Sequence, residues 1–362
     1  MSECIGIINL DENVNDFEGI TSKENLASIE FAGKYRIIDF VLSNLNNSDI
    51  EEIGIFSHKK SDVLLKYLTN NKFWKVNQKN NKINIFNYGE YNICEDDIHN
   101  FMDNIEFIKR SKKEYVIITP SYMICNIDYK KVLEFHKNNN NDITTIYKKQ
   151  YLKNDKFLNC EELMISVNNK VIDIKKVIKP KEFININMEM YIMNTKLFLD
   201  IITNSITNGL YKKVKDYIKS NLNNLDIKAY EFRGYLSCIN STKAFFKSNK
   251  EVLDVNINNE LFYSNGIIYS DFEDSTPTYY SNNSKVINSI ISNGSYIEGK
   301  VENSVIGKNV KIGKGAIVKN SVLMSNVNIE EGCIINNIII NQNNKINNYE
   351  VYSGKENNPK VL

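Results

Sequence analysis

The sequence has no long apolar run and no strong excess of charge. None of its apolar stretches approaches the roughly 18 residues of a transmembrane helix. Met1-Ser2-Glu3-Cys4 places no basic segment before the short apolar run that follows, as a secretory signal would. Because 45 basic residues nearly cancel 44 acidic ones, the formal net charge is only +1. We therefore expect a cytoplasmic protein that neither spans a membrane nor binds nucleic acid.

Closely spaced cysteines and hydrolase motifs are also absent. The lack of any Cys-x-x-Cys pair argues against a zinc knuckle or a disulfide framework, so we expect reduced, ordinary thiols. The six cysteines are Cys4, Cys94, Cys125, Cys160, Cys238 and Cys333. No Gly-x-Ser-x-Gly elbow occurs, and this excludes a hydrolase of that geometry.

Short β-branched runs alternate with helical patterns over the first two thirds of the chain, which predicts a doubly wound, Rossmann-like α/β domain over residues 1–250. The expected strands are Cys4–Asn9, Glu52–Ser57, Tyr115–Thr119, Asp142–Lys148, Leu163–Ser166, Met188–Met193 and Asp226–Phe232. The expected helices are Tyr35–Leu45, Asp103–Lys109, Tyr129–His136, Thr195–Ile202 and Ser241–Leu253.

A different period follows a loosely patterned stretch that we interpret as a linker over 251–282. Aliphatic residues recur every six positions, with glycine after Ile306 and Ile312, and this period is typical of a left-handed parallel β-helix, predicted over 283–362. They are Ile306, Ile312, Val318 and Met324, and then Ile334, Ile340 and Ile346. Because all three histidines (His58, His99 and His136) precede this domain, we expect a structural or oligomerising module rather than a histidine-dependent acyltransferase.

The most informative stretch is Phe31-Ala32-Gly33-Lys34-Tyr35-Arg36-Ile37-Ile38-Asp39-Phe40-Val41-Leu42-Ser43-Asn44. This basic, glycine-containing turn runs into a helix, a usual place for a phosphorylated ligand, but the acidic Asp11-Glu12-Asn13-Val14-Asn15-Asp16 precedes it. Together with the two domains, the stretch resembles the bacterial ADP-glucose pyrophosphorylases (glucose-1-phosphate adenylyltransferases), and among them the GlgD-type second subunit. The resemblance implies Mg²⁺-dependent synthesis of ADP-glucose and pyrophosphate from ATP and glucose 1-phosphate.

The phosphate-binding segments of that family are substituted here, which makes 1–250 a degenerate nucleotidyltransferase-like domain. The family's Gly-Gly-x-Gly-Thr-Arg-Leu loop falls on residues 11–17, with three acids and no glycine, and such a loop should not bind ATP. Its Lys-Arg-Ala-Lys-Pro segment corresponds to Lys23-Glu24-Asn25-Leu26-Ala27. Its Arg-Gly-Thr-Ala-Asp-Ala segment corresponds to Glu95-Asp96-Asp97-Ile98-His99-Asn100.

The resemblance also places Tyr122 and Cys238 where the family has its two metal-binding aspartates. Mg²⁺ needs hard oxygen ligands, so we expect no metal or cofactor in this chain and Mg²⁺ only in a catalytic partner. Lys179 corresponds to the family's sugar-phosphate lysine, or is a solvated loop lysine. A metal cluster at Asp96, Asp97 and His99 lacks a third defined ligand, so we expect a solvated acidic loop there, and likewise at Asp271, Glu273 and Asp274.

We therefore interpret the chain as a regulatory, catalytically deficient subunit that joins a catalytic ADP-glucose pyrophosphorylase chain, as a tetramer, in glycogen biosynthesis. Lys23, Lys34 and Arg36 are the candidate effector or phosphate-binding residues for a sugar phosphate, although Arg36 and Asp39 would equally pair within the helix. Two alternatives stay open: an active sugar-1-phosphate nucleotidyltransferase with relocated ligands such as Asp128, and a pure assembly scaffold.

Overall fold

The computed structural model describes the chain except for residues 1–2, 11–16, 18, 21–24, 58–61, 72, 75–81, 88–95, 152–156, 180 and 272–274. It divides into two compact units. Unit 1 comprises residues 1–12, 40–238 and 265–268, and unit 2 comprises residues 13–39, 239–264 and 269–362. The predicted division into a domain over 1–250, a linker over 251–282 and a domain over 283–362 stays a proposal. None of the helices in the described ranges is long and apolar enough to cross a membrane.

Unit 1 is built on a mixed β-sheet, in which β1 (Cys4–Asn9), β4 (Glu52–Ser57), β5 (Lys82–Asn87) and β6 (Tyr115–Pro120) are parallel and some other pairs of strands are antiparallel. Its main path runs β10 (Val171–Lys176), β9 (Glu161–Ile165), β11 (Phe183–Asn194), β6, β1, β4 and β5, and β8 (Ile143–Tyr151) joins β11 to β12 (Ile227–Glu231). Strand β1 is parallel to β4 and β6, whereas β11 is antiparallel to β6. The carboxyl ends of β1 and β6 therefore meet at one edge, where ligands usually bind in such sheets.

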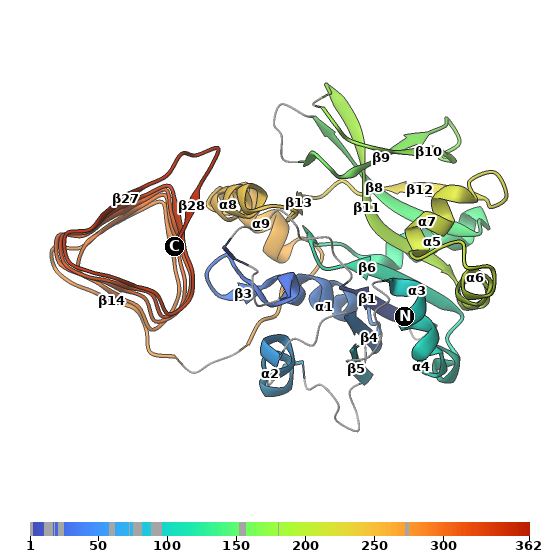
Figure 1. Cartoon of the computed structure of the whole chain (residues 1–362), viewed down its shortest axis with the longest axis horizontal. Coiled ribbons are helices and arrows are strands. Elements are labelled where there is room, and N and C mark those ends of the chain that lie inside the picture. The colour runs from blue at the N-terminus through green and yellow to red at the C-terminus, as the bar shows by residue number, and fades with distance from the viewer. Residues whose placement is uncertain are drawn as a thin grey trace. The chain divides into compact units, whose positions relative to one another are not determined.

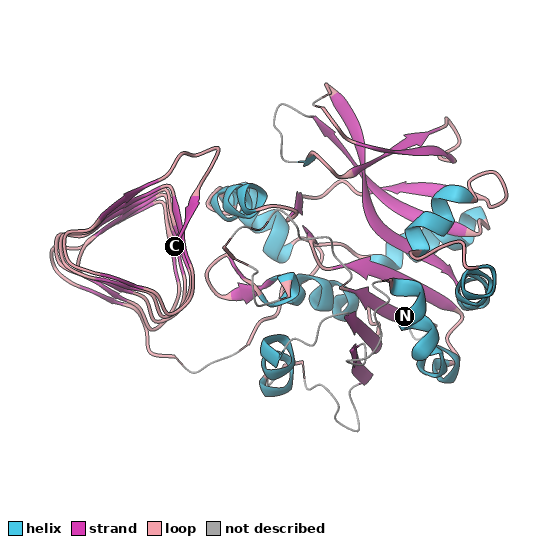
Figure 2. Cartoon of the chain, in the orientation of Figure 1, coloured by secondary structure: helices cyan, strands magenta, loops and turns pink. Residues whose placement is uncertain are grey.

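Helices cover both faces of this sheet, as the doubly wound prediction requires. Ile5 and Ile7 of β1 join a buried cluster with Phe101 and Phe198 on one face. Gly6 points to the other face, where an added Cβ would lie 3.0 Å from Leu45 Cδ1. The helices, drawn in Figure 2, are α1 (Ile37–Asn47), α2 (Asp62–Asn70), α3 (Asp97–Asp103), α4 (Ile105–Ser111), α5 (Tyr129–Asn139), α6 (Thr195–Asn208) and α7 (Val214–Ser220).

Most predicted elements are present, with boundaries that shift by a few residues. The helix expected from Tyr35 begins at Ile37, because Tyr35–Arg36 (β3) instead pairs with Glu30–Phe31 (β2) in a hairpin. Helices α2, α3 and α7 were not predicted. In unit 2, α8 (Thr242–Glu251) is followed by α9 (Val255–Tyr263), which lies within the span interpreted as a linker and is capped by Asp254.

The C-terminal part of unit 2 is the left-handed parallel β-helix that the repeat predicted, with a triangular cross-section (Figure 1). Its three sheets are β14 (Tyr279–Tyr280), β17 (Tyr296–Ile297), β20 (Lys311–Ile312), β23 (Asn328–Ile329) and β26 (Lys345–Ile346); β15 (Lys285–Ile287), β18 (Lys300–Glu302), β21 (Ile317–Lys319), β24 (Ile334–Asn336) and β27 (Val351–Ser353); and β16 (Ile290–Ile291), β19 (Val305–Ile306), β22 (Val322–Leu323), β25 (Ile338–Ile340) and β28 (Lys360–Val361). Lys300, Ile317, Ile334 and Val351 stack in one column, so these coils repeat every 17 residues.

The coil length of 17 corrects part of the predicted register, since it combines two six-residue steps with one of five residues. Ile306, Ile312 and Val318 fill the interior as expected. After Val318 the interior cluster contains Leu323 and Ile335 in place of the predicted Met324 and Ile334, and it contains Ile340 and Ile346 as predicted. Ile334, which a strict six-residue period places inside, is 42% exposed.

Asparagine occupies many corners of the β-helix. Asn303, Asn309, Asn320 and Asn326 all have positive φ values between 47° and 62°, a conformation that asparagine tolerates better than most residues. Successive corners are linked through their side chains, for example Asn326 Nδ2 to Asn343 Oδ1 at 3.1 Å. These residues therefore stabilise the turns of the repeat.

His136 in α5 makes the stability of unit 1 depend on pH. It is buried against Thr144, with Nδ1 2.9 Å from the hydroxyl oxygen, and burial lowers its pKa from 6.5 to about 4. Between these two values the unfolded chain binds the proton and the folded chain does not, so stability falls as the pH falls, by about 3 kcal/mol for a shift of this size. Below about pH 4 the effect is complete.

Urea denaturation at pH 7.0, 5.5 and 4.5, followed by the fluorescence of the single, buried Trp74 of unit 1, measures this dependence. The His136→Asn variant should show a clearly shallower loss of stability over the same range. An equal loss in both proteins would contradict the assignment to His136.

Candidate functional site

Unit 1 contains a small cavity of about 40 Å³ at the carboxyl ends of β1 and β6. Asn9 and Pro120, the last residues of these strands, line it together with Asp97, Ile118, Tyr122, Glu189, Tyr191, Lys213, Val214 and Lys215. Parallel strands usually present ligand-binding groups at this edge. Among the described residues, however, the space accommodates about one water molecule. Residues 11–16, which align with most of the family's phosphate loop, lie outside the described residues.

The structure brings Tyr122 and Cys238 together. Tyr122 directly precedes β7 (Met123–Cys125), and Cys238 ends β13 (Leu236–Cys238), which pairs with β7 so that Cys238 lies opposite Met123. Two positions that are 116 residues apart in the sequence thus become neighbours, as two ligands of one metal ion would be.

The chemistry at these positions does not fit Mg²⁺. Burial, and then the carboxylate of Glu189 and the thiols of Cys238 and Cys160, raise the pKa of Tyr122 well above its ordinary value, so the phenol stays protonated. A protonated phenol and a thiol are poor ligands for a hard cation. In the described ranges, no group of three or more histidine, cysteine or acidic side chains is arranged to hold a metal ion.

The wall of this cavity contains an ion pair between Glu189 and Lys215 that no sequence motif indicates. Lys215 Nζ lies 3.3 Å from both carboxylate oxygens of Glu189. Burial lowers the pKa of Lys215, but the charges of Glu189 and Glu161 outweigh it and raise the pKa. The lysine is therefore charged and already paired with carboxylates of its own chain.

Glu189 is held by an unusual backbone. Its φ of +52° is a left-handed conformation, rare for a residue with a long side chain, and it lies where the pairing of β11 with β8 shifts register. Asn187 stabilises the bulge, since its Oδ1 accepts a hydrogen bond from the Glu189 amide at 3.0 Å. An interrupted ladder of this kind leaves no signal in the apolar pattern, which is why the residue was missed.

The other acidic candidates in unit 1 support helices. Asp96 and Asp97 are buried, so the predicted solvated acidic loop is wrong. Asp96 caps α3, accepting hydrogen bonds from the His99 amide at 2.8 Å and Nδ1 at 2.7 Å, and Asp97 accepts bonds from Asn9 and Val214 at 3.0 Å. Asp128 caps α5 through the Lys130 amide.

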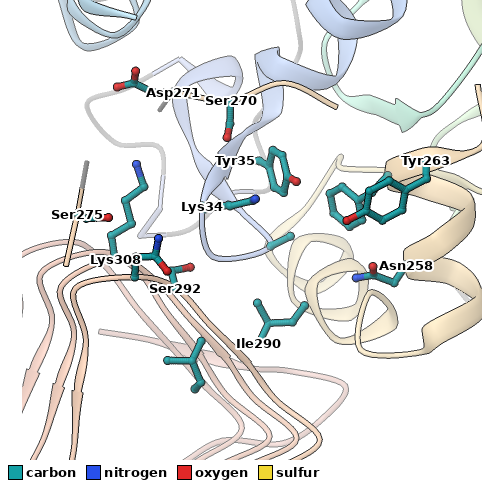
Figure 3. A pocket seen from close by; sticks show the side chains of 14 residues that line it. Lys34, Tyr35, Asn258, Tyr263, Ser270, Asp271, Ser275, Ile290, Ser292 and Lys308 are labelled. Atoms are coloured by element: carbon teal, nitrogen blue, oxygen red, sulfur yellow. The ribbon is translucent and has the colours of Figure 1, made fainter. Parts of the chain in front are cut away.

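A larger cavity, of about 370 Å³, lies in unit 2 and contains Lys34 (Figure 3). Lys308 of the β-helix lines it as well, with Tyr35, Asn258, Tyr263, Ser270, Asp271, Ser275 and Ser292 among its other polar groups. Partial burial, and then the positive charge of Lys308, lower the pKa of Lys34. Two cations that repel each other in a polar cavity provide a site for an anion.

The hairpin β2–β3 holds Lys34 at this cavity. Ala32 and Gly33 turn the chain with φ values of +51° and +82°, and a Cβ on Gly33 would lie 2.6 Å from Ser292 Oγ, so only glycine fits against the β-helix coil. The Ala32 amide donates a hydrogen bond to Asn249 Oδ1 at 2.8 Å. Glu30 Oε2 accepts bonds from the amide and hydroxyl of Ser325, each at 2.8 Å.

The remaining predicted site residues lie elsewhere. The guanidinium of Arg36 donates to the carbonyl oxygen of Ser28, and the Arg36 amide donates to Asp39 Oδ2 at 2.8 Å, so Arg36 braces the start of α1. Lys179 is exposed in the loop after β10. Lys23, Glu273 and Asp274 lie outside the described residues, whereas Asp271 lines the cavity of Lys34. Lys308 was missed because only the fold brings it near the hairpin.

Comparison with known proteins identifies two families along the chain. Residues 17–254 match the nucleotidyl transferase family, and residues 276–357 match the GlmU-like, C-terminal hexapeptide family. Over 88% of this chain, it is 31% identical to the glycogen biosynthesis protein GlgD of Geobacillus stearothermophilus and 27% identical to that of Bacillus subtilis (strain 168), covering 83% of each relative. It is also 31% identical to the glucose-1-phosphate adenylyltransferase of Thermosipho africanus (strain TCF52B), covering 83% of this chain and 74% of that protein. The chain therefore belongs to the nucleotidyl transferase family, alongside the GlgD proteins and the glucose-1-phosphate adenylyltransferases.

Proposed function

We propose that this chain is a regulatory, catalytically deficient subunit of a glucose-1-phosphate adenylyltransferase in glycogen biosynthesis. Its partner is a catalytic ADP-glucose pyrophosphorylase chain, and the two form a tetramer in the cytoplasm. The catalytic partner holds the Mg²⁺ of this assembly. The names of the relatives supply the pathway and the reaction. The pairing of Tyr122 with Cys238 supplies the main argument for deficiency.

Nucleotidyl transfer requires the negative charge of the phosphates to be neutralised and positioned. At the neighbouring positions of Tyr122 and Cys238, a protonated phenol and a thiol stand in place of metal carboxylates. The nearby cation, Lys215, is paired with Glu189. These groups neither hold Mg²⁺ nor offer an unpaired positive charge to a triphosphate.

We assign the regulatory ligand to the cavity of Lys34 and Lys308. Its volume of about 370 Å³ lies within the range of small-molecule sites, and its two lysines favour an anion. The phosphate of a sugar phosphate would pair with the two lysines, and its hydroxyls would form hydrogen bonds with the serines and Asn258 that line the cavity. A ligand that binds more tightly in one state of the assembly would shift the activity of the partner.

The experiment compares three preparations: this chain alone, the catalytic chain alone, and the two co-expressed. Pyrophosphate release from ATP and glucose 1-phosphate with Mg²⁺ measures turnover, and light scattering measures mass. We expect this chain alone to be slower than the catalytic chain by roughly 10³-fold or more, and the co-expressed preparation to form one larger species with an altered response to sugar phosphates.

Two outcomes would contradict the proposal. Turnover by this chain alone that Asp128→Asn abolishes would favour an active enzyme with relocated metal ligands. A stable complex whose kinetics and sugar-phosphate response equal those of the catalytic chain alone would favour a pure scaffold.

A further inference from the structure

Two thiols meet inside unit 1. Cys160 Sγ lies 3.1 Å from Cys238 Sγ, although the two residues are 78 positions apart. Cys160 directly precedes β9, and Cys238 ends β13. Cys238 is fully buried and Cys160 is 6% exposed, and both are in the reduced thiol form. No sequence pattern indicates this pair, because its spacing matches no cysteine motif.

The backbone fixes both cysteines. The Cys160 amide donates to the Phe157 carbonyl at 3.3 Å, and the Cys160 carbonyl accepts from the Val177 amide at 2.9 Å. Cys238 is held in the β7–β13 ladder opposite Met123. A disulfide bond requires the sulfurs to approach by only about 1 Å from their present distance, which side-chain rotation can supply.

We propose that Cys160 and Cys238 form a reversible disulfide bond when the protein is exposed to hydrogen peroxide. The thiolate of Cys160, the more accessible of the two, attacks one peroxide oxygen. The O–O bond breaks, leaving a sulfenic acid, and the displaced hydroxide takes up a proton to become water. The thiolate of Cys238 then attacks the sulfenic sulfur, the S–O bond breaks, and a second water leaves.

The balance of this reaction is two thiols oxidised by two electrons and one peroxide reduced to two waters. Hydrogen peroxide is small enough to enter the cavity beside the thiols. It is only slightly larger than water, and this cavity, which Tyr122 lines, has a volume of about 40 Å³. A bulky disulfide reagent would not fit, because it would have to form a mixed disulfide with a cysteine in the packed interior. The inference rests on the geometry of the two thiols and is independent of the proposed function.

The bond would restrict the chain where it leaves unit 1. Cys238 is the last residue of unit 1 before the chain continues at Ile239 into unit 2. The disulfide would close a long loop between β9 and β13, and such closure stabilises the folded state by constraining the unfolded chain. We expect the oxidised protein to unfold at a temperature several degrees higher than the reduced protein.

The test uses the full-length chain, reduced and then treated with a small molar excess of hydrogen peroxide. After denaturation and alkylation of the remaining thiols, we expect two fewer alkylated cysteines. Without alkylation, the intact mass should fall by about 2 Da, and dithiothreitol should restore it. Proteolysis should yield one linked species that contains both Cys160 and Cys238.

Cys160→Ser and Cys238→Ser should each abolish the linked species, whereas Cys125→Ser, a matched control in adjacent β7 that is also fully buried, should retain it. Peptide mapping of the peroxide-treated wild-type protein decides the question even if a variant fails to fold. A gain of oxygen atoms without loss of two thiols, or a link that involves a different cysteine, would overturn the proposal.

Discussion

Replacing Lys34 or Lys308 by glutamine should weaken the binding of a sugar phosphate by about 10-fold or more each, the usual loss for a hydrogen bond to a charged group. The same substitutions should leave the unliganded protein as stable as before, or slightly more stable. Burial, and then the charge of Lys308, lower the pKa of Lys34, so both the desolvation of Lys34 and the repulsion between the two lysines persist until an anion lies between them. Lower ligand affinity without loss of fold distinguishes a binding site from a structural pair.

Thermal-shift titrations with inorganic phosphate, a hexose monophosphate and a hexose bisphosphate measure both effects, because a ligand that binds the folded state raises its apparent stability. Lys300→Gln is the matched control: Lys300 is an exposed lysine of β18 in the same β-helix, and it does not line the cavity. An unphosphorylated hexose serves as the ligand control. Equal shifts in the two lysine variants and the wild type would remove the site from consideration.

Replacing Ile335 by alanine should destabilise the β-helix by about 3 kcal/mol, within the usual range for a fully buried isoleucine. Ile335 has no exposed surface and packs in the interior cluster of the coils. Its neighbour Ile334 is the matched control, since it is 42% exposed and its replacement by alanine should cost no more than about 0.5–1 kcal/mol. The pair differs in little besides the side of the coil on which each residue lies.

Hydrogen exchange of peptides from β21 to β25, measured by mass spectrometry, reports this difference locally. The single tryptophan, Trp74, belongs to unit 1 and would not detect it. Faster exchange in Ile334→Ala than in Ile335→Ala would show that the strict six-residue register, rather than the observed one, is correct.

The two isoleucines also show what the sequence could predict. The repeat predicted the β-helix because aliphatic residues must stack in its interior. After Val318 the repeat predicted Ile340 and Ile346 correctly but missed Leu323 and Ile335, because one side of each coil is five residues long and a fixed period cannot follow that step. Similarly, the alternation of apolar residues predicted the central strands, but not α9, whose start depends on hydrogen bonds from Asn256 and Ile257 to Asp254.

The candidate sites divide in the same way. Tyr122 and Cys238 could be identified by resemblance, since each lies in a short motif that can be aligned along the chain. Glu189 could not, because its role depends on a bulge that Asn187 stabilises. Lys308 is 274 positions from Lys34 in the sequence, and only the packing of the hairpin within unit 2 brings both to one cavity.

The 17-residue coil also limits how the length of this domain can change. Removing one residue between Lys300 and Val351 would shift every later residue by one position in its column. Interior aliphatic residues would then exchange places with exposed polar ones. Removing a complete coil would leave each column in phase and merely shorten the prism. Insertions and deletions in relatives of this chain should therefore occur as whole coils, or as loops that bulge from a corner such as the segment 355–359 before β28.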